Sequence, residues 1–136
     1  NNMGAAMAPA AYATIKAHFD DMKTAPEDFD LIVTGDLGQL GKEMLLELAR
    51  RDGVSLGGKL TDCGTMVFDN DKQDVHAGGS GCGCCASVLA AYVLPQMQAG
   101  LYKNVLVAAT GALMSPTTNQ QGESIPAISH LIRLTI

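Results

Sequence analysis

The fold is decided by residues 76–99, which read HAGGSGCGCCASVLAAYVLPQMQA. The first part is a glycine-rich loop, and residues 84–99 have the length and composition of a helix that ends at Gly100. This helix has almost no polar face, because apolar side chains such as Val88, Tyr92 and Met97 lie all round it. A helix that is apolar on every side is buried on every side. We therefore expect residues 84–99 to be covered on all faces, either by this chain or by a partner.

Helix-like and strand-like patterns alternate along the rest of the chain. Apolar residues recur at helical spacing over residues 4–22, behind Asn2 as N-cap, and again over residues 40–48 before Gly53. Strands are predicted at residues 31–34, 59–68, 105–109 and 128–136. Alternating strands and helices are typical of the α/β class with a mostly parallel sheet. The chain opens on a helix and stops within a strand, which we expect of a piece of a longer protein.

Charge, hydropathy and cysteine spacing argue against several classes of function. The formal net charge is −5, and lysine and arginine are scattered singly, so no basic stripe favours nucleic acid. The apolar runs are much shorter than a membrane-spanning helix. Cys82, Cys84 and Cys85 fall within four positions, which does not suit the spaced disulfide framework of a secreted protein. A reducing, cytoplasmic location is expected.

The glycine-rich loop before the helix is the first candidate for a binding site. Backbone N–H groups at a helix N-terminus attract anions, and glycines let a ligand approach closely. His76 and Ser80 would add side-chain donors. The same glycines would equally permit close packing between buried helices, so both interpretations stand at this stage.

Three roles fit the cysteine cluster. A zinc site would need further ligands, and Cys63 and His76 are the nearby side chains that could supply them. A reactive thiolate is the second role, because a helix N-terminus lowers the pKa of a cysteine. Small apolar packing within a buried helix is the third role, and it is the one that we favour.

The order of elements, with a glycine loop that leads into a buried helix, resembles the second half of the thiolase and ketoacyl-synthase fold. In that fold a helix from each half lies buried in the middle, so the resemblance implies that residues 1–136 are an incomplete, C-terminal thiolase-like half-domain. A closer resemblance, spread over almost the whole chain, is to the stage V sporulation protein AD family. Four runs carry it: residues 3–10 (MGAAMAPA), 32–38 (IVTGDLG), 74–83 (DVHAGGSGCG) and 120–126 (QQGESIP).

This resemblance implies a non-catalytic protein that binds dipicolinic acid, alone or with calcium, and takes part in its uptake into the developing spore. No cofactor is expected. The candidate ligand-binding residues are His76, Gly78, Gly79, Ser80, Asp36 and Gly111. The implied partners are an N-terminal half of the same protein, membrane subunits of the spore dipicolinate channel, and a second copy in a homodimer. The implied location is cytoplasmic, or peripheral at the spore inner membrane.

An active acyl-transfer enzyme of the thiolase or ketoacyl-synthase type is the alternative function. Condensing enzymes of that type carry a catalytic histidine at the strand end where this chain has Gly35, and their asparagine aligns near Gly79. Neither glycine has a side chain that can donate to an oxyanion, which argues against catalysis. In this alternative His76 would act as acid and base. Asp36 is a further candidate base, although we favour a capping role for it at the helix of residues 40–48.

Overall fold

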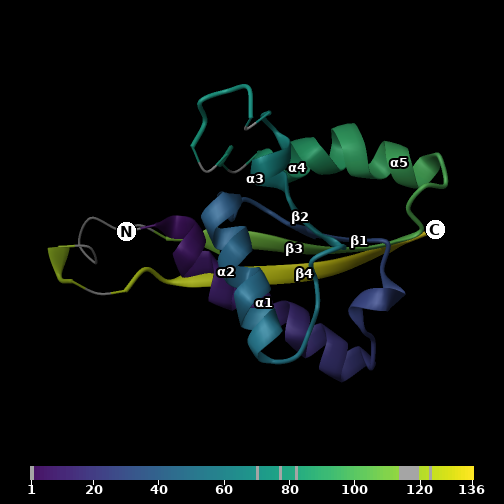
Figure 1. The fold of residues 1–136 in the computed structure, drawn as a ribbon, viewed down its shortest axis with the longest axis horizontal. Coiled ribbons are helices and arrows are strands. Elements are labelled where there is room, and N and C mark those ends of the chain that lie inside the picture. Colours follow the sequence, from purple (N-terminus) through teal and green to yellow (C-terminus); the bar gives the residue numbers. More distant parts are fainter. Residues whose placement is uncertain (1, 70, 77, 82, 114–119, 123) are drawn as a thin grey trace.

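The computed structural model describes residues 2–69, 71–76, 78–81, 83–113, 120–122 and 124–136. A four-stranded sheet forms the middle layer, and helices cover both of its faces (Figure 1). The elements, in chain order, are α1 (Met3–Met22), η1 (Pro26–Asp28), β1 (Leu31–Thr34), α2 (Gly38–Arg51), β2 (Leu60–Asp62), α3 (Cys63–Met66), α4 (Cys84–Val88), η2 (Leu89–Val93), α5 (Leu94–Gln98), β3 (Asn104–Ala112) and β4 (Ala127–Thr135). The predicted α/β class is confirmed.

The sheet has the strand order β2-β1-β3-β4. β1 pairs in parallel with both of its neighbours, which places Thr34 opposite Asp62 of β2 and opposite Ala108 of β3. β4 is antiparallel to β3, so the predicted mostly parallel sheet is also confirmed. Because parallel strands end at the same edge of a sheet, the residues that follow Thr34, Asp62 and Ala108 come together there.

The second strand is shorter than the sequence predicts. We expected a strand over residues 59–68, but β2 ends at Asp62 and the chain turns at once into α3. The Thr65 hydroxyl donates to the Asp62 carbonyl oxygen at 2.9 Å. A local side-chain hydrogen bond of this kind competes with a sheet ladder for the backbone group. The strand pattern after Asp62 is therefore overridden by a turn.

α1 and α2 cover one face of the sheet. α1 begins behind Asn2, whose side chain accepts a hydrogen bond from the Ala5 N–H at 3.0 Å, and this confirms the predicted N-cap. The two helices meet at glycines, because a Cβ atom added to Gly41 would lie 2.9 Å from the Gly4 carbonyl oxygen. The core beneath them includes the buried side chains of Met7, Ala11, Ile15, Phe19, Phe29, Ile32, Leu45 and Leu106.

A helical run over α4, η2 and α5 covers the opposite face of the sheet (Figure 1). η2 is a π-helical turn just before Pro95, which has no N–H for a regular α-helical hydrogen bond. The buried side of the run packs against the sheet through Cys84, Val88, Val93 and Met97. On its other side, Tyr92 and Leu94 are 39% and 43% exposed. This chain thus covers one side of a helix that the sequence predicts to be covered all round.

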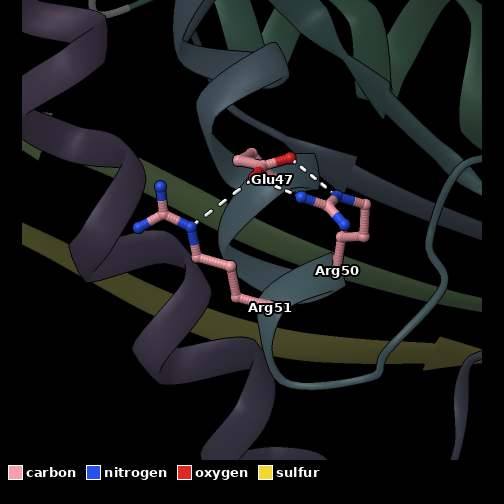
Figure 2. Close-up of polar contacts among 3 residues, drawn as sticks. All are labelled: Glu47, Arg50 and Arg51. Carbon is pink, nitrogen blue, oxygen red and sulfur yellow. Dashed lines mark hydrogen bonds and ion pairs between the residues drawn. The ribbon is translucent and has the colours of Figure 1, made fainter.

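The solvent side of α2 carries a small ion-pair cluster (Figure 2). Glu47 Oε1 lies 2.7 Å from Arg50 Nη2 and 3.5 Å from Arg51 Nε. Pairs this open to water add little to stability, because solvent and salt screen them. The cluster marks the outer face of an amphipathic helix whose Leu45 and Ala49 are buried. Among the described residues, no helix is both long enough and apolar enough to cross a membrane.

Candidate ligand-binding site

A cavity of about 410 Å³ opens at the carboxyl ends of β1 and β3, the edge at which ligands bind in open α/β sheets. Four segments that are distant in the sequence form its wall: the start of α1, the turn after β1, the glycine loop with α4, and the end of β3. The lining residues are Met3, Met7, Gly35, Asp36, Ser80, Gly81, Cys85, Ala109, Thr110, Gly111 and Ala112.

Asp36 is the charged group in this lining, and hydrogen bonds hold its carboxylate from two sides. The Thr110 hydroxyl donates to Asp36 Oδ1 at 2.8 Å. The Ser80 hydroxyl donates to Asp36 Oδ2 at 2.9 Å, and the Gly81 N–H donates to the same oxygen at 3.3 Å. Asp36 therefore ties the glycine loop to the end of β3.

The predicted capping role of Asp36 is wrong, because Asp62 caps α2 instead. Asp62 is wholly buried, and its carboxylate accepts from the Leu37 N–H at 2.9 Å and from the Gly38 N–H at 3.0 Å. The Thr34 hydroxyl also donates to Asp62 Oδ1, at 2.6 Å. Burial raises the pKa of Asp62, while these hydrogen bonds act in the opposite direction. With Asp62 at the helix start, the Asp36 side chain is left to face the cavity.

The structure brings three of the six candidate residues to the cavity: Asp36, Ser80 and Gly111. Gly111 lies within β3 and not in a loop after it, because the strand predicted to end at Ala109 continues to Ala112. There it pairs with Ile128 of β4.

Gly78 and Gly79 lie apart from the cavity lining and pack against α3. The Gly79 N–H donates to the Gly64 carbonyl oxygen at 2.6 Å. Gly78 has φ +112°, and a Cβ atom there would collide with the same carbonyl oxygen. At Gly78 the absence of a side chain allows the loop backbone to lie directly on the α3 backbone, which is the packing interpretation of this glycine. A Cβ atom added to Gly79 would instead lie 3.3 Å from the side chains of Val67 and Phe68.

His76 lies outside the cavity lining as well. Its side chain is 89% exposed, and its Nδ1 lies 3.8 Å from Asp74 Oδ1. The backbone of His76 has φ +53°, in the left-handed region that few residues other than glycine adopt. It is the side chain of Ser80, four residues later, that contacts Asp36.

The cysteines divide between the cavity and the core. Cys63 and Cys84 are buried, and Cys85 is half-buried in the cavity wall. A hydrogen bond from the Cys63 thiol lowers the pKa of Cys85 to about 7, and the same contact raises the pKa of Cys63. Cys82 lies outside the described residues, and in the part of the chain that the structure describes no three His, Cys, Asp or Glu side chains are grouped to hold a metal ion.

Sequence reasoning missed Thr110 and Cys85 as parts of this site. Thr110 had a usable signal, since it follows a predicted strand as Asp36 does, and neighbouring parallel strands end together. Met3 and Met7 also line the cavity, although the sequence singled them out only as part of residues 3–10, one of the runs that carry the family resemblance. Cys85 had no distinguishing signal, because its contact with Cys63 depends on how α3 packs against α4.

The layers and the cavity together define an α/β protein with a pocket at the carboxyl edge of its parallel strands. A family model for stage V sporulation protein AD (SpoVAD) matches residues 1–135. Stage V sporulation protein AD of Bacillus subtilis (strain 168) is 47% identical over 129 residues, which cover 95% of this chain and 38% of that protein. The chain belongs to the stage V sporulation protein AD family, and it spans well under half the length of this curated relative.

Proposed function

We propose that the full-length protein containing this chain binds dipicolinic acid and serves its uptake into the developing spore, with this chain as one wall of the site. Family membership supports the sporulation role. The observation that carries the binding site is the carboxylate of Asp36, which Thr110 and Ser80 hold in the lining of a cavity of about 410 Å³. Cavities of this volume lie in the range that small ligands occupy.

The lining suits a planar aromatic ring with polar groups at one end. Met3, Met7 and Ala112 supply apolar surface, and Met side chains adapt their shape to flat ligands. Ser80 and Thr110 supply hydroxyl oxygens beside Asp36. Dipicolinate has this division, because its two carboxylates and its ring nitrogen lie along one edge of the ring and the opposite edge is apolar.

The charge of Asp36 favours dipicolinate as its calcium complex over the free dianion. A free dianion brought against the Asp36 carboxylate would be repelled in a partly desolvated place. Dipicolinate chelates a cation through both carboxylates and its ring nitrogen, which leaves coordination positions open. Calcium takes about 6–8 oxygen ligands, and the oxygens of Asp36, Ser80 and Thr110 are of the right kind to occupy them.

The remainder of the full-length protein is proposed to close the site. The outer side of the α4–α5 run is apolar and exposed in this chain, with Tyr92 and Leu94 in its middle. A second half-domain, arranged as in thiolase-like folds, would cover this side and supply the opposite wall of the cavity. On this proposal the chain is the C-terminal half-domain, and a homodimer and the membrane subunits of the dipicolinate channel are its further partners.

An acyl-transfer enzyme is the second candidate, and Cys85 is the observation in its favour. A thiol whose pKa is lowered to about 7 in a cavity wall is a competent nucleophile. Against it, His76 is exposed outside the cavity, so no histidine in the described lining is placed to take a proton from Cys85 or to give one to a leaving group. We therefore place ligand binding first.

Calorimetric titration of the full-length protein tests the proposal. Dipicolinate is titrated in two separate experiments, one with equimolar calcium and one with a chelator that removes calcium. Isophthalate is titrated in the same way as the matched control ligand. Isophthalate has the same two carboxylates on a six-membered ring but lacks the nitrogen, so it chelates calcium poorly. We expect calcium to raise the affinity for dipicolinate at least about tenfold (about 1.4 kcal/mol). We expect no such gain for isophthalate. Absence of dipicolinate binding under both conditions would refute the function.

A further inference from the structure

A second cavity, of about 360 Å³, adjoins the cavity that holds Asp36, and Gly111 and Ala112 line both. It lies between the end of β3 and the start of β4. Its lining residues are all apolar: Gly111, Ala112, Leu113, Pro126, Ala127 and Ile128. Leu113 and Ile128 are 66% and 56% exposed there. The cavity that holds Asp36 therefore continues into an apolar one, and Gly111 stands at the boundary.

The backbone of β3 does not require a glycine at position 111. Glycine weakens a strand, because it loses more conformational freedom on folding than other residues and has no side chain to pack. The residues of β3 and β4 pair one for one on both sides of Gly111, so no bulge accounts for it. Its φ lies outside the left-handed region, unlike the φ of Gly78 and Gly81. Another residue could adopt this backbone.

The space beside Gly111 is also open. A Cβ atom added to Gly111 would lie 3.6 Å from Ile128 Cγ2, which is ordinary van der Waals contact. Gly35, on the opposite wall, differs because a Cβ atom there would lie 2.7 Å from Thr110 Oγ1. Packing within this chain thus accounts for Gly35 but not for Gly111. A strand glycine of this kind often marks a place where a ligand or another backbone approaches closely.

We propose that Gly111 sets the ligand class of the site: it admits to the second cavity an apolar substituent of an aromatic dicarboxylate whose polar edge lies at Asp36. The place of the carboxylates rests on the proposed function. With the polar edge against Asp36 and Thr110, the opposite edge of the ring lies toward Gly111 and Ala112. A strand rises about 3.3 Å per residue, so Leu113 lies about 10 Å beyond Thr110, which a phenyl group on that edge can span.

Protein backbone from the rest of the full-length protein is the other occupant that a strand glycine can accommodate. The second cavity offers such a backbone no hydrogen-bond partners. Its own backbone groups are already paired, since Gly111 pairs with Ile128 and the Leu113 N–H donates to the Pro126 carbonyl oxygen at 3.0 Å. Peptide groups that lose water without gaining partners are costly to bury. The lining therefore favours an apolar group of a small molecule.

Calorimetric titration of the full-length protein, with equimolar calcium present, compares three ligands. These are dipicolinate, its analogue with a phenyl group opposite the ring nitrogen, and its analogue with a hydroxyl group at the same position. Because burial of apolar surface is favourable roughly in proportion to its area, the phenyl analogue should bind at least about tenfold more tightly than dipicolinate. The hydroxyl analogue should show no such gain.

Gly111→Val places two methyl groups between the cavities, so the advantage of the phenyl analogue over dipicolinate should disappear. Ile128→Asn changes an exposed side chain of the second cavity alone and should also reduce that advantage, which keeps the test open if Gly111→Val does not fold. Gly57→Ala is the control, because it lies outside both cavities and a Cβ atom there meets no described atom within 4 Å. An advantage equal to that of the wild type in both Gly111→Val and Ile128→Asn would overturn the role of Gly111.

Gly111→Ala distinguishes the ligand from protein backbone as the occupant. Without ligand, the full-length variant should be at least as stable to urea as the wild type, because alanine is favoured over glycine within a strand. A marked loss of stability would show that protein fills the space beside Gly111, which would overturn the proposal.

The same titrations separate the ligand class from the proposed function. Tight binding of dipicolinate with no gain from the phenyl group would overturn the role of Gly111 and leave the proposed function standing. Tight binding of the phenyl analogue alone would support the role of Gly111 and refute dipicolinate as the ligand. Absence of binding by all three ligands would refute both.

Discussion

The hydroxyl of Thr110 donates to Asp36 Oδ1 at 2.8 Å and accepts from the Asp36 backbone N–H at 2.9 Å. Through these two hydrogen bonds the end of β3 holds both the backbone and the side chain of the residue that follows β1. A carboxylate fixed in this way faces the cavity in a single orientation, which is what a site for a charged ligand requires.

The first prediction concerns this contact. Thr110→Val keeps the shape of the side chain and removes both hydrogen bonds, so the free energy of unfolding should fall by about 1–2 kcal/mol. Affinity for calcium dipicolinate should fall by about tenfold, because Asp36 is no longer held. Thr110→Ser retains the hydroxyl, so its free energy of unfolding and its affinity for calcium dipicolinate should both stay close to those of the wild type. Urea unfolding and calorimetric titration measure them, and equal affinity in the Val and Ser variants would contradict the role of the hydroxyl.

The second prediction concerns stability at alkaline pH. The Tyr12 hydroxyl donates to Asp52 Oδ2 at 2.6 Å and joins α1 to the end of α2. Burial, together with this contact, raises the pKa of Tyr12 from 10.0 to about 12. Because the folded-state pKa exceeds the unfolded-state value, the contribution of Tyr12 is fully present below pH 10.0 and is lost as the pH rises through about 12.

Tyr12→Phe should therefore be less stable than the wild type by about 1 kcal/mol at neutral pH, and the difference should shrink only above the unfolded-state pKa. Urea unfolding at several pH values measures it. If the stability difference between the wild type and Tyr12→Phe already shrinks below pH 10.0, ionisation of Tyr12 is not its cause.

The third prediction separates binding from catalysis. With acetyl and malonyl thioesters, the full-length protein should turn over more slowly than about 0.01 per second. Ordinary enzymes work at about 1–1000 per second, and loss of an oxyanion donor costs about two to three orders of magnitude. Gly35 and Gly79 can supply no side-chain donor. Turnover near 1 per second that disappears in Cys85→Ala would instead support the acyl-transfer function.

The fourth prediction concerns the apolar side of the α4–α5 run. This chain alone should bind calcium dipicolinate at least about a hundredfold more weakly than the full-length protein, because an open wall leaves the ligand hydrated. Its exposed apolar surface should also promote self-association. Leu94→Asn should reduce that self-association in the chain alone. It should also destabilise the full-length protein if the proposed second half-domain covers this side. Sedimentation measures self-association and urea unfolding measures stability. A variant that changes neither would contradict the proposal that a second half-domain covers this side and completes the cavity.

Much of the fold could be predicted because its signals are local. The apolar run at residues 31–34 and the helical spacing of residues 4–22 each belong to one element, and the structure confirms both. The strand expected beyond Asp62 could not be excluded from the sequence, because the turn there depends on the Thr65 hydroxyl and on the carboxylate that caps α2.

The candidate site was predictable only where it follows a strand end. The sequence places Asp36 at the sheet edge. It does not show that Asp62, rather than Asp36, accepts the hydrogen bonds at the start of α2, because that contact depends on the pairing of β1 with β2. His76 shows the opposite case: its place in a glycine loop suggested a ligand contact, whereas the loop backbone turns the side chain into solvent. Contacts of this kind depend on tertiary packing and leave no pattern in the sequence.

The most direct test of the account compares Asp36→Asn with the wild type in titrations of full-length protein with dipicolinate, with and without calcium. The amide is nearly isosteric but uncharged, so it should reduce affinity for the calcium complex by at least about tenfold and abolish the advantage that calcium gives. His76→Ala, whose side chain lies outside the cavity, is the comparison and should bind as the wild type does. If Asp36→Asn keeps the full calcium-dependent affinity while His76→Ala loses it, the ligand is held by the outer loop and not by the cavity at the ends of β1 and β3.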